Sequence, residues 1–199
     1  MKIGIIGAST VGITLATHFL SANHEVMVAN SRGPESLRER LAEIDSRLIA
    51  ASAFEASICD VVFLAVPWLK VKDVLTPDHD WQGRILVDTT NIFVNYAPDF
   101  QIDDLKGDSG SEIVSKLAPS ARTVKAFNTL PFEKMFEPHE SQLKRVLFLA
   151  GDDSSAVDKV AQLVTELDLS PVPLGSLAVA GRLMELTGPL SGLQLFSAT

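Results

Sequence analysis

The sequence has a single cysteine, no long apolar run and no excess of basic residues. Cys59 has no second cysteine with which to form a disulfide, so we expect a buried, inert thiol in the reducing cytoplasm. No apolar run approaches the roughly 20 residues of a membrane-spanning helix, and we expect no signal peptide because the first strand begins at once. The 25 acidic and 17 basic residues give a net charge of −8, which argues against nucleic acids and anionic membranes as partners.

Side chains suited to acid–base catalysis are equally scarce. The one tyrosine, Tyr96, is followed four residues later by Phe100 and not by a lysine, which excludes the mechanism of the short-chain dehydrogenases. The four histidines are scattered along the chain, and none has an evident partner for general-base or metal chemistry. The sequence therefore identifies no catalytic residue and predicts no metal site.

The start of the chain carries the most informative motif. An apolar stretch over residues 1–6 predicts a short buried strand, and Gly7, Ser9 and Gly12 follow in a variant of the pattern G-x-G-x-x-G with serine at the middle position. Gly7 permits a tight turn, Gly12 permits close packing of the next helix (residues 12–22), and backbone N–H groups at the helix N-terminus attract a pyrophosphate. We predict that a dinucleotide binds at Gly7, Ser9, Thr10, Val11 and Gly12, the alternative being an ordinary strand-to-helix turn.

The second predicted strand, residues 25–29, leads into Asn30, Ser31 and Arg32. In dinucleotide-binding folds an acidic residue at this point binds the 2′-hydroxyl of NAD, whereas a cation accommodates the 2′-phosphate of NADP. No carboxylate stands at positions 28–34. Arg32 can pair with a phosphate through two N–H groups, and Ser31 can donate from its hydroxyl. We therefore predict NADP as the cofactor in preference to NAD, with a polar loop and one exposed arginine as the alternative.

Apolar and amphipathic segments alternate along the 199 residues, of which 46% are hydrophobic. Further strands are expected at 48–51, 61–66, 85–88, 123–126 and 146–150, with a short strand or extended link at 171–173. Helices are expected at 34–44, 53–58 and 111–117 and from residue 154 on. The alternation predicts an α/β fold with a doubly wound, mainly parallel Rossmann-type sheet. We expect residues 1–175 to form an NADP-binding Rossmann domain, and residues 176–199 to form a short helical C-terminal extension that packs on the cleft or on a dimer interface.

In such a sheet, ligands bind at the carboxyl ends of the strands. We predict that the cofactor contacts Ala65, Val66 and Pro67 after the fourth strand, Thr90 and Asn91 after the fifth, and Ala126, Phe127 and Asn128 after the sixth. The alternative is simple strand termination, since Asn, Thr and Pro are common at turns.

The motifs resemble those of the NADPH-dependent reductases of the deazaflavin coenzyme F420, and of the wider bacterial group of dinucleotide-binding oxidoreductases around them. The matching segments are residues 2–7, 30–34, 64–67, 124–129 and 180–185. The resemblance implies that the pyrophosphate contacts Ser9, Thr10 and Val11, that the 2′-phosphate contacts Ser31 and Arg32, and that the nicotinamide neighbours Val66, Thr90 and Ala126. Some members of the group carry a lysine shortly after the Ser-Arg pair. This chain has Glu35 and Ser36 there, and Arg38 is the nearest following cation.

A nucleotide cleft without an evident acid or base suits one reaction in particular, because hydride transfer between a nicotinamide and a flavin-like ring requires the protein only to align the two rings. We therefore expect an NADP(H)-dependent oxidoreductase that acts on a flavin, a deazaflavin or another small-molecule acceptor. Two alternatives stay open: an NADPH-dependent reductase of a small carbonyl or imine, and a non-catalytic module that binds NADPH. The many apolar residues from Leu177 on, together with the resemblance, favour a homodimer.

Overall fold

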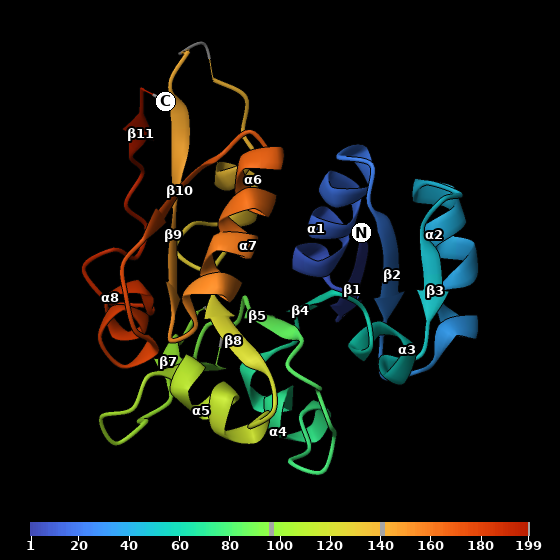
Figure 1. Cartoon of the computed structure of the whole chain (residues 1–199), viewed down its shortest axis with the longest axis horizontal. Helices are drawn as coiled ribbons and strands as arrows, with labels where there is room; N and C mark the ends of the chain where they lie inside the picture. Colours follow the sequence, from blue (N-terminus) through green and yellow to red (C-terminus); the bar gives the residue numbers. More distant parts are fainter. Residues whose placement is uncertain (96–97, 140–141, 199) are drawn as a thin grey trace.

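In the computed structural model, which describes residues 1–95, 98–139 and 142–198, a central β-sheet lies between two layers of helices (Figure 1). Nine strands of the described part form this sheet, in the order β10-β9-β8-β5-β4-β1-β2-β3 with β11 paired to β9. The α/β class and the mainly parallel Rossmann-type sheet expected from the sequence are confirmed. Tyr96 lies outside the described residues.

The strands of this sheet are β1 (Lys2–Ile6), β2 (Glu25–Ala29), β3 (Ile49–Ala51), β4 (Val61–Leu64), β5 (Ile85–Asp88), β8 (Arg122–Lys125), β9 (Lys144–Gly151), β10 (Ser170–Pro173) and β11 (Phe196–Ser197). All pairings from β3 across the sheet to β8 are parallel. β4 and β5 are buried along their whole length, which explains the uninterrupted apolar sequence of β4 and the apolar residues 85–87 of β5. β9 runs antiparallel to β8, and β10 runs parallel to β9, so this side of the sheet is mixed. A separate hairpin is formed by β6 (Phe93–Asn95) and β7 (Gln101–Ile102).

Two buried clusters show how the helices divide between the faces of the sheet. One cluster joins β1 and β4 to α1 (Thr10–Ser21), α6 (Phe132–Met135) and α7 (Ser154–Glu166). It also contains Leu41 of α2 (Arg38–Ile44), a helix that follows a single 3₁₀ turn, η1 (Pro34–Ser36). The other cluster holds residues of α3 (Ala53–Ser57), the 3₁₀ turn η2 (Trp68–Lys70), α4 (Val71–Val74) and α5 (Gly110–Leu117). Helices therefore cover both faces, as a doubly wound sheet requires.

The C-terminal segment, drawn in red in Figure 1, differs from the helical extension expected from its sequence. A π-helix, η3 (Leu177–Gly181), and one turn of α-helix, α8 (Arg182–Met184), pack on β9 through an apolar cluster. The helical part ends at Met184, and after a series of turns β11 pairs antiparallel with the start of β9. The Arg145 guanidinium lies 5.2 Å from the centre of the Phe196 ring, so a cation–π contact stabilises this return to the sheet.

Candidate functional site

The turn between β1 and α1 requires glycine at two positions. Gly7 has a φ of +121°, and a Cβ there would lie 2.1 Å from the carbonyl oxygen of Ala65. A Cβ at Gly12 would lie 1.8 Å from the carbonyl oxygen of Gly7, so only glycine lets α1 pack this closely on the turn. Ser9 is the N-cap residue of α1, but its side chain does not cap the helix and its hydroxyl donates to Ala65 O at 3.5 Å. The first N–H groups of α1 are therefore left for a ligand, and they favour an anion.

The loop after β2 lies beside this turn. The link is direct, because the backbone N–H of Gly7 donates to the carbonyl of Ala29 at 2.9 Å. Asn30 shapes the loop by accepting from the backbone N–H of Arg32 at 2.9 Å. Ser31 and Arg32 are exposed, and no ion pair in the described part of the chain involves the Arg32 guanidinium.

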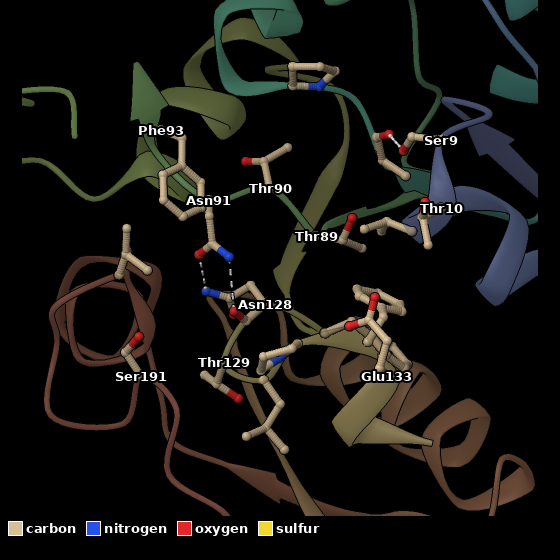
Figure 2. Close-up of a pocket in the computed structure, with 18 of the residues that line it drawn as sticks. Ser9, Thr10, Thr89, Thr90, Asn91, Phe93, Asn128, Thr129, Glu133 and Ser191 are labelled. Atoms are coloured by element: carbon tan, nitrogen blue, oxygen red, sulfur yellow. Dashed lines mark hydrogen bonds between the residues drawn. The ribbon is translucent and has the colours of Figure 1, made fainter. Parts of the chain in front are cut away.

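A pocket of about 620 Å³ opens where the central strands end (Figure 2). β4 ends at Leu64, two residues earlier than the expected strand, because Ala65 and Val66 leave the sheet and line the pocket. The pocket brings together most of the residues predicted to bind the cofactor: Ser9, Thr10, Val11, Ala65, Val66, Pro67, Thr90, Asn91, Phe127 and Asn128. That these side chains contact NADP stays a prediction.

The other predicted residues do not line this pocket. Gly7 and Gly12 are buried in the turn, and Ala126 is buried behind the pocket wall. Asn30, Ser31 and Arg32 lie beside the turn, where the adenosine end of a dinucleotide is expected.

Thr89 and Thr129, which belong to the strand-end segments expected at the cleft, also line the pocket, as does Leu186 of the apolar C-terminal segment. Sequence reasoning missed the rest of the pocket wall: Phe93, Leu130, Pro131, Phe132, Glu133, Ser191 and Gly192. Residues 130–133 directly follow the strand end at Thr129, so including the next four residues of the chain would have found them. Phe93 belongs to the β6–β7 hairpin, and Leu186 and Ser191 belong to the irregular C-terminal segment. No pattern in the sequence marks Phe93 or Ser191, whereas Leu186 belongs to the apolar C-terminal residues expected at the cleft or at a dimer interface.

Asn91 and Asn128 join two strand ends at the pocket. The Asn91 Nδ2 group donates to the backbone oxygen of Asn128 at 3.0 Å, and the Asn128 Nδ2 group donates to Asn91 Oδ1 at 3.2 Å. Figure 2 shows the two side chains pointing toward one another. Asn128 Nδ2 also donates to the carbonyl of Met184 at 2.8 Å, which ties the C-terminal segment to the pocket. The buried Asn128 Oδ1 atom has no partner among the described residues, so it can accept from a ligand or a water.

A fully buried ion pair lies behind Thr90. Asp88 Oδ2 accepts from Lys125 Nζ at 3.0 Å and from the Ser111 hydroxyl at 2.6 Å, while Asp88 Oδ1 accepts from the hydroxyl and the N–H of Thr90 at 2.7 and 2.9 Å. Lys125 Nζ also donates to the carbonyl of Thr90 at 2.5 Å. Burial raises the pKa of Asp88, but the Lys125 charge and the hydrogen bonds outweigh it and the pKa is lowered overall. The network holds Thr90 in place by three of its polar groups.

Phe127 turns the chain at the end of β8. Its φ is +61°, a left-handed conformation that is unusual for a bulky residue. The ring is buried against Phe63, with ring centres 5.8 Å apart. Packing therefore holds the strained backbone in place, and this backbone leads directly into the pocket-lining residues 128–133.

Apolar side chains, hydroxyl groups and two amides line the pocket. Glu133 is the one charged side chain among the described lining residues. No group of three or more His, Cys, Asp or Glu that could hold a metal ion occurs in residues 1–95, 98–139 and 142–198. Within the same ranges, no helix is both long enough and apolar enough to cross a membrane. The arrangement can bind an anion at the α1 N-terminus and a flat organic ring between the strand ends.

Comparisons with known proteins agree with this geometry. Residues 2–92 match the family model described as NADP oxidoreductase coenzyme F420-dependent. The crystal structure of a hypothetical protein from Sinorhizobium meliloti is 40% identical, with a TM-score of 0.89 over 99% of this chain and 96% of that one. A protein from Arthrobacter sp. FB24, proposed to be an F420-dependent NADP reductase, is 23% identical with a TM-score of 0.75 over 91% of this chain and 87% of its own.

A mammalian relative matches over a part of its length. Metalloreductase STEAP3 of Rattus norvegicus is 28% identical over 182 residues, which are 90% of this chain and 35% of that protein. The chain thus spans about a third of the length of the curated relatives that it matches.

Proposed function

We propose that the chain passes hydride between the nicotinamide of NADP and a flavin-like or deazaflavin ring. Residues 2–92 match the family model described as NADP oxidoreductase coenzyme F420-dependent, which supports this proposal. The cofactor is NADP. The acceptor, and the residues that hold the cofactor and the acceptor, are what we propose.

The described residues fit NADP at three places. The turn at Gly7 and the uncapped N-terminus of α1 suit the pyrophosphate. Ser31 and Arg32, exposed beside that turn, suit the 2′-phosphate. Val66 and Thr90 line the pocket at neighbouring strand ends and suit the nicotinamide.

The reaction requires the protein to align the nicotinamide with the acceptor ring. When bound, NADP supplies or receives the hydride. The chain's own residues bind the two partners and fix their orientation, because Thr90 is held by Asp88 and Lys125 and because Asn91 and Asn128 hold each other. Rigid positioning of this kind contributes most to a reaction in which two rings must meet face to face.

The acceptor side of the pocket combines an aromatic ring, aliphatic groups and amides. Phe93, Leu130 and Leu186 line the same pocket as Asn91 and Asn128. Aromatic and aliphatic side chains pack on a flat ring, and amides donate to and accept from its polar edge. This composition supports a flavin-like acceptor.

We also propose that residues 1–175 form the NADP-binding domain and that residues 176–199 complete the acceptor side. Leu186, Ser191 and Gly192 line the pocket, and the N–H of Gly192 donates to the carbonyl of Thr129 at 2.7 Å. Val179 is 62% exposed on η3, which supports a homodimer through this segment. Analytical ultracentrifugation tests the dimer, and a monomer at every concentration would contradict it.

The single observation that carries the proposal is the continuity of the pocket. One cavity reaches from Ser9, Thr10 and Val11 at the helix N-terminus to Asn91 and Asn128. A dinucleotide bound at the turn would therefore place its reactive end beside the space that an acceptor can enter.

The test is turnover of NADPH with a panel of acceptors. NADPH oxidation is followed with riboflavin, FMN, deazaflavin, quinones, and a set of small ketones and imines. We expect turnover with a flavin or deazaflavin and slower turnover with NADH. Turnover with carbonyls or imines alone would favour the reductase alternative, and tight NADPH binding without turnover would favour a binding module.

A matched pair of variants separates the acceptor side from the cofactor side. Phe93→Ala removes a ring from the pocket, so we expect kcat/KM for the acceptor to fall about tenfold or more while the Kd for NADPH stays unchanged. Phe54→Ala is the control, because Phe54 is 65% exposed on α3 and does not line the pocket. Equal effects of the two variants would contradict the assignment of Phe93.

A further inference from the structure

Arg40, which no motif singled out, reaches from α2 to the phosphate turn. Its Nη1 group donates to the backbone carbonyl of Ala8 at 3.0 Å. Ala8 follows Gly7 and precedes the N-cap residue Ser9. A side chain thirty-two positions further along the chain is thus held directly at the turn that the pyrophosphate is expected to occupy.

The contact also places Arg40 at the turn that adjoins the Arg32 loop. The hydrogen bond from Gly7 N to Ala29 O holds the turn against the end of β2. Ala8 is the next residue after Gly7, and the loop that carries Arg32 begins directly after Ala29. Arg40 is thus held at the turn, and the loop that carries Arg32 adjoins the same turn.

Arg32, Arg38 and Arg40 differ in whether an acidic side chain pairs with them. Arg38 is neutralised by Glu35, with Nη1 and Oε2 2.7 Å apart. Arg32 and Arg40 are exposed, and neither is part of an ion pair in the described portion of the chain. A guanidinium has five N–H donors, so the single bond to Ala8 leaves Arg40 with donors and its full charge for an anion.

We propose that Arg40 is a second specificity residue for NADP, which donates to the 2′-phosphate together with Arg32 while Ala8 holds it in place. The inference deepens the proposed function, on which it rests. Two guanidiniums that converge on one phosphoryl group bind it through charge-assisted hydrogen bonds. Arg38, the nearest following cation in the sequence, takes no part because Glu35 occupies it.

The experiment uses two ligands that differ by one phosphate and lack the nicotinamide. Titration calorimetry gives the Kd of 2′,5′-ADP and of 5′-ADP for the wild type, Arg40→Ala, Arg40→Lys and Arg38→Ala. We expect Arg40→Ala to weaken 2′,5′-ADP about tenfold, the scale of a charge-assisted hydrogen bond, and to change 5′-ADP less than about twofold. Arg40→Lys should recover part of the loss, and Arg38→Ala should leave both ligands unchanged.

Each outcome of the titrations distinguishes one role of Arg40 from the others. An equal loss for both ligands would show that Arg40 only braces the turn, and unchanged binding in Arg40→Ala would show that Arg32 acts alone; both results overturn the inference and leave the proposed function standing. A wild type that binds the two ligands equally would overturn the NADP assignment itself. Arg40→Gln keeps a donor for Ala8 without the charge, so weaker binding of 2′,5′-ADP with unchanged binding of 5′-ADP in this variant separates loss of the charge from a general loss of folding.

Discussion

Replacing Lys125 by methionine tests the buried charge network behind the pocket. Lys125 Nζ lies 3.0 Å from Asp88 Oδ2, and both side chains are completely buried. Removing one partner of such a pair destabilises a protein by about 3–5 kcal/mol, because the remaining charge is uncompensated. In Lys125→Met the carboxylate keeps its hydrogen bonds from the Thr90 hydroxyl, the Thr90 N–H and the Ser111 hydroxyl. We therefore expect the free energy of unfolding to fall by about 3 kcal/mol, the lower end of that range.

The loss should depend on pH in a defined direction. In the wild type the folded pKa of Asp88 is lowered, because the Lys125 charge and the hydrogen bonds outweigh the raising effect of burial. Its contribution to stability is thus complete above the unfolded pKa of about 3.9 and is lost only as the pH falls through the lower folded value. Without Lys125, burial dominates and the folded pKa rises above the unfolded one. As the pH falls, the variant therefore gains stability relative to the wild type, and the difference in unfolding free energy between them narrows.

Urea unfolding at several pH values measures both effects. Lys70→Met is the matched control, because Lys70 pairs with Asp73 at 2.9 Å with both side chains more than 60% exposed; such pairs contribute less than about 1 kcal/mol. A loss below about 1 kcal/mol for Lys125→Met, or a difference that widens as the pH falls, would refute the reasoning. The double variant Asp88→Asn, Lys125→Met should be more stable than the sum of the two single losses predicts, because it leaves no charge uncompensated.

Three further predictions concern single residues. Arg32→Ala should weaken NADPH binding by about 1–3 kcal/mol, the scale of a lost hydrogen bond to a charged group, and should hardly affect NADH; a fluorescence titration with an equal loss for both cofactors would refute the 2′-phosphate assignment. Gly12→Ala places a Cβ 1.8 Å from the carbonyl oxygen of Gly7. We therefore expect the unfolding free energy to fall by about 1–3 kcal/mol and NADPH binding to be lost. A variant with the thermal stability and the NADPH affinity of the wild type would contradict this. Burial raises the pKa of the Cys59 thiol to about 11, so iodoacetamide should not modify the native protein near neutral pH. Intact-mass spectrometry measures the modification, and rapid alkylation would show an accessible thiolate and contradict the prediction.

Most strands were predictable because their apolar sequences are bounded by glycine or by polar residues. β2 and β5 begin and end where the patterns indicated. The direction of β9 was not predictable, since a buried apolar run reads the same for a parallel and an antiparallel strand. β11 is two residues long, too short for any periodicity, and it depends on pairing with residues some fifty positions earlier. The helical pattern of the C-terminal segment is realised only as far as Met184.

The parts of the site that depend on local sequence were predictable, and the parts that depend on contacts between distant residues were not. The phosphate turn is local, because the two glycines that shape it and the helix that follows lie within a few residues of each other. Strand ends are nearly as local, and the rule for parallel sheets identified Val66, Thr90 and Asn128 as pocket residues. Arg40 was missed because its role depends on one long-range contact, to Ala8. The Asp88–Lys125 pair was missed because two strands must be placed side by side before the charges meet.

The cofactor side and the acceptor side of the pocket therefore depend on the sequence in different ways. The cofactor side relies on backbone N–H groups and on glycines that allow close approach, so its requirements constrain residue type strongly and leave a motif. The proposed acceptor side is assembled from Phe93 of β6, residues 129–133, and Leu186, Ser191 and Gly192, which contribute mostly apolar and hydroxyl side chains. Phe93 and Leu186 lie outside the buried clusters, so they can be exchanged without disturbing the turn or the sheet. Members of one family can thus keep NADP and change the acceptor, and this is why the acceptor has to be identified by the turnover panel and by variants such as Phe93→Ala rather than by fold or motif.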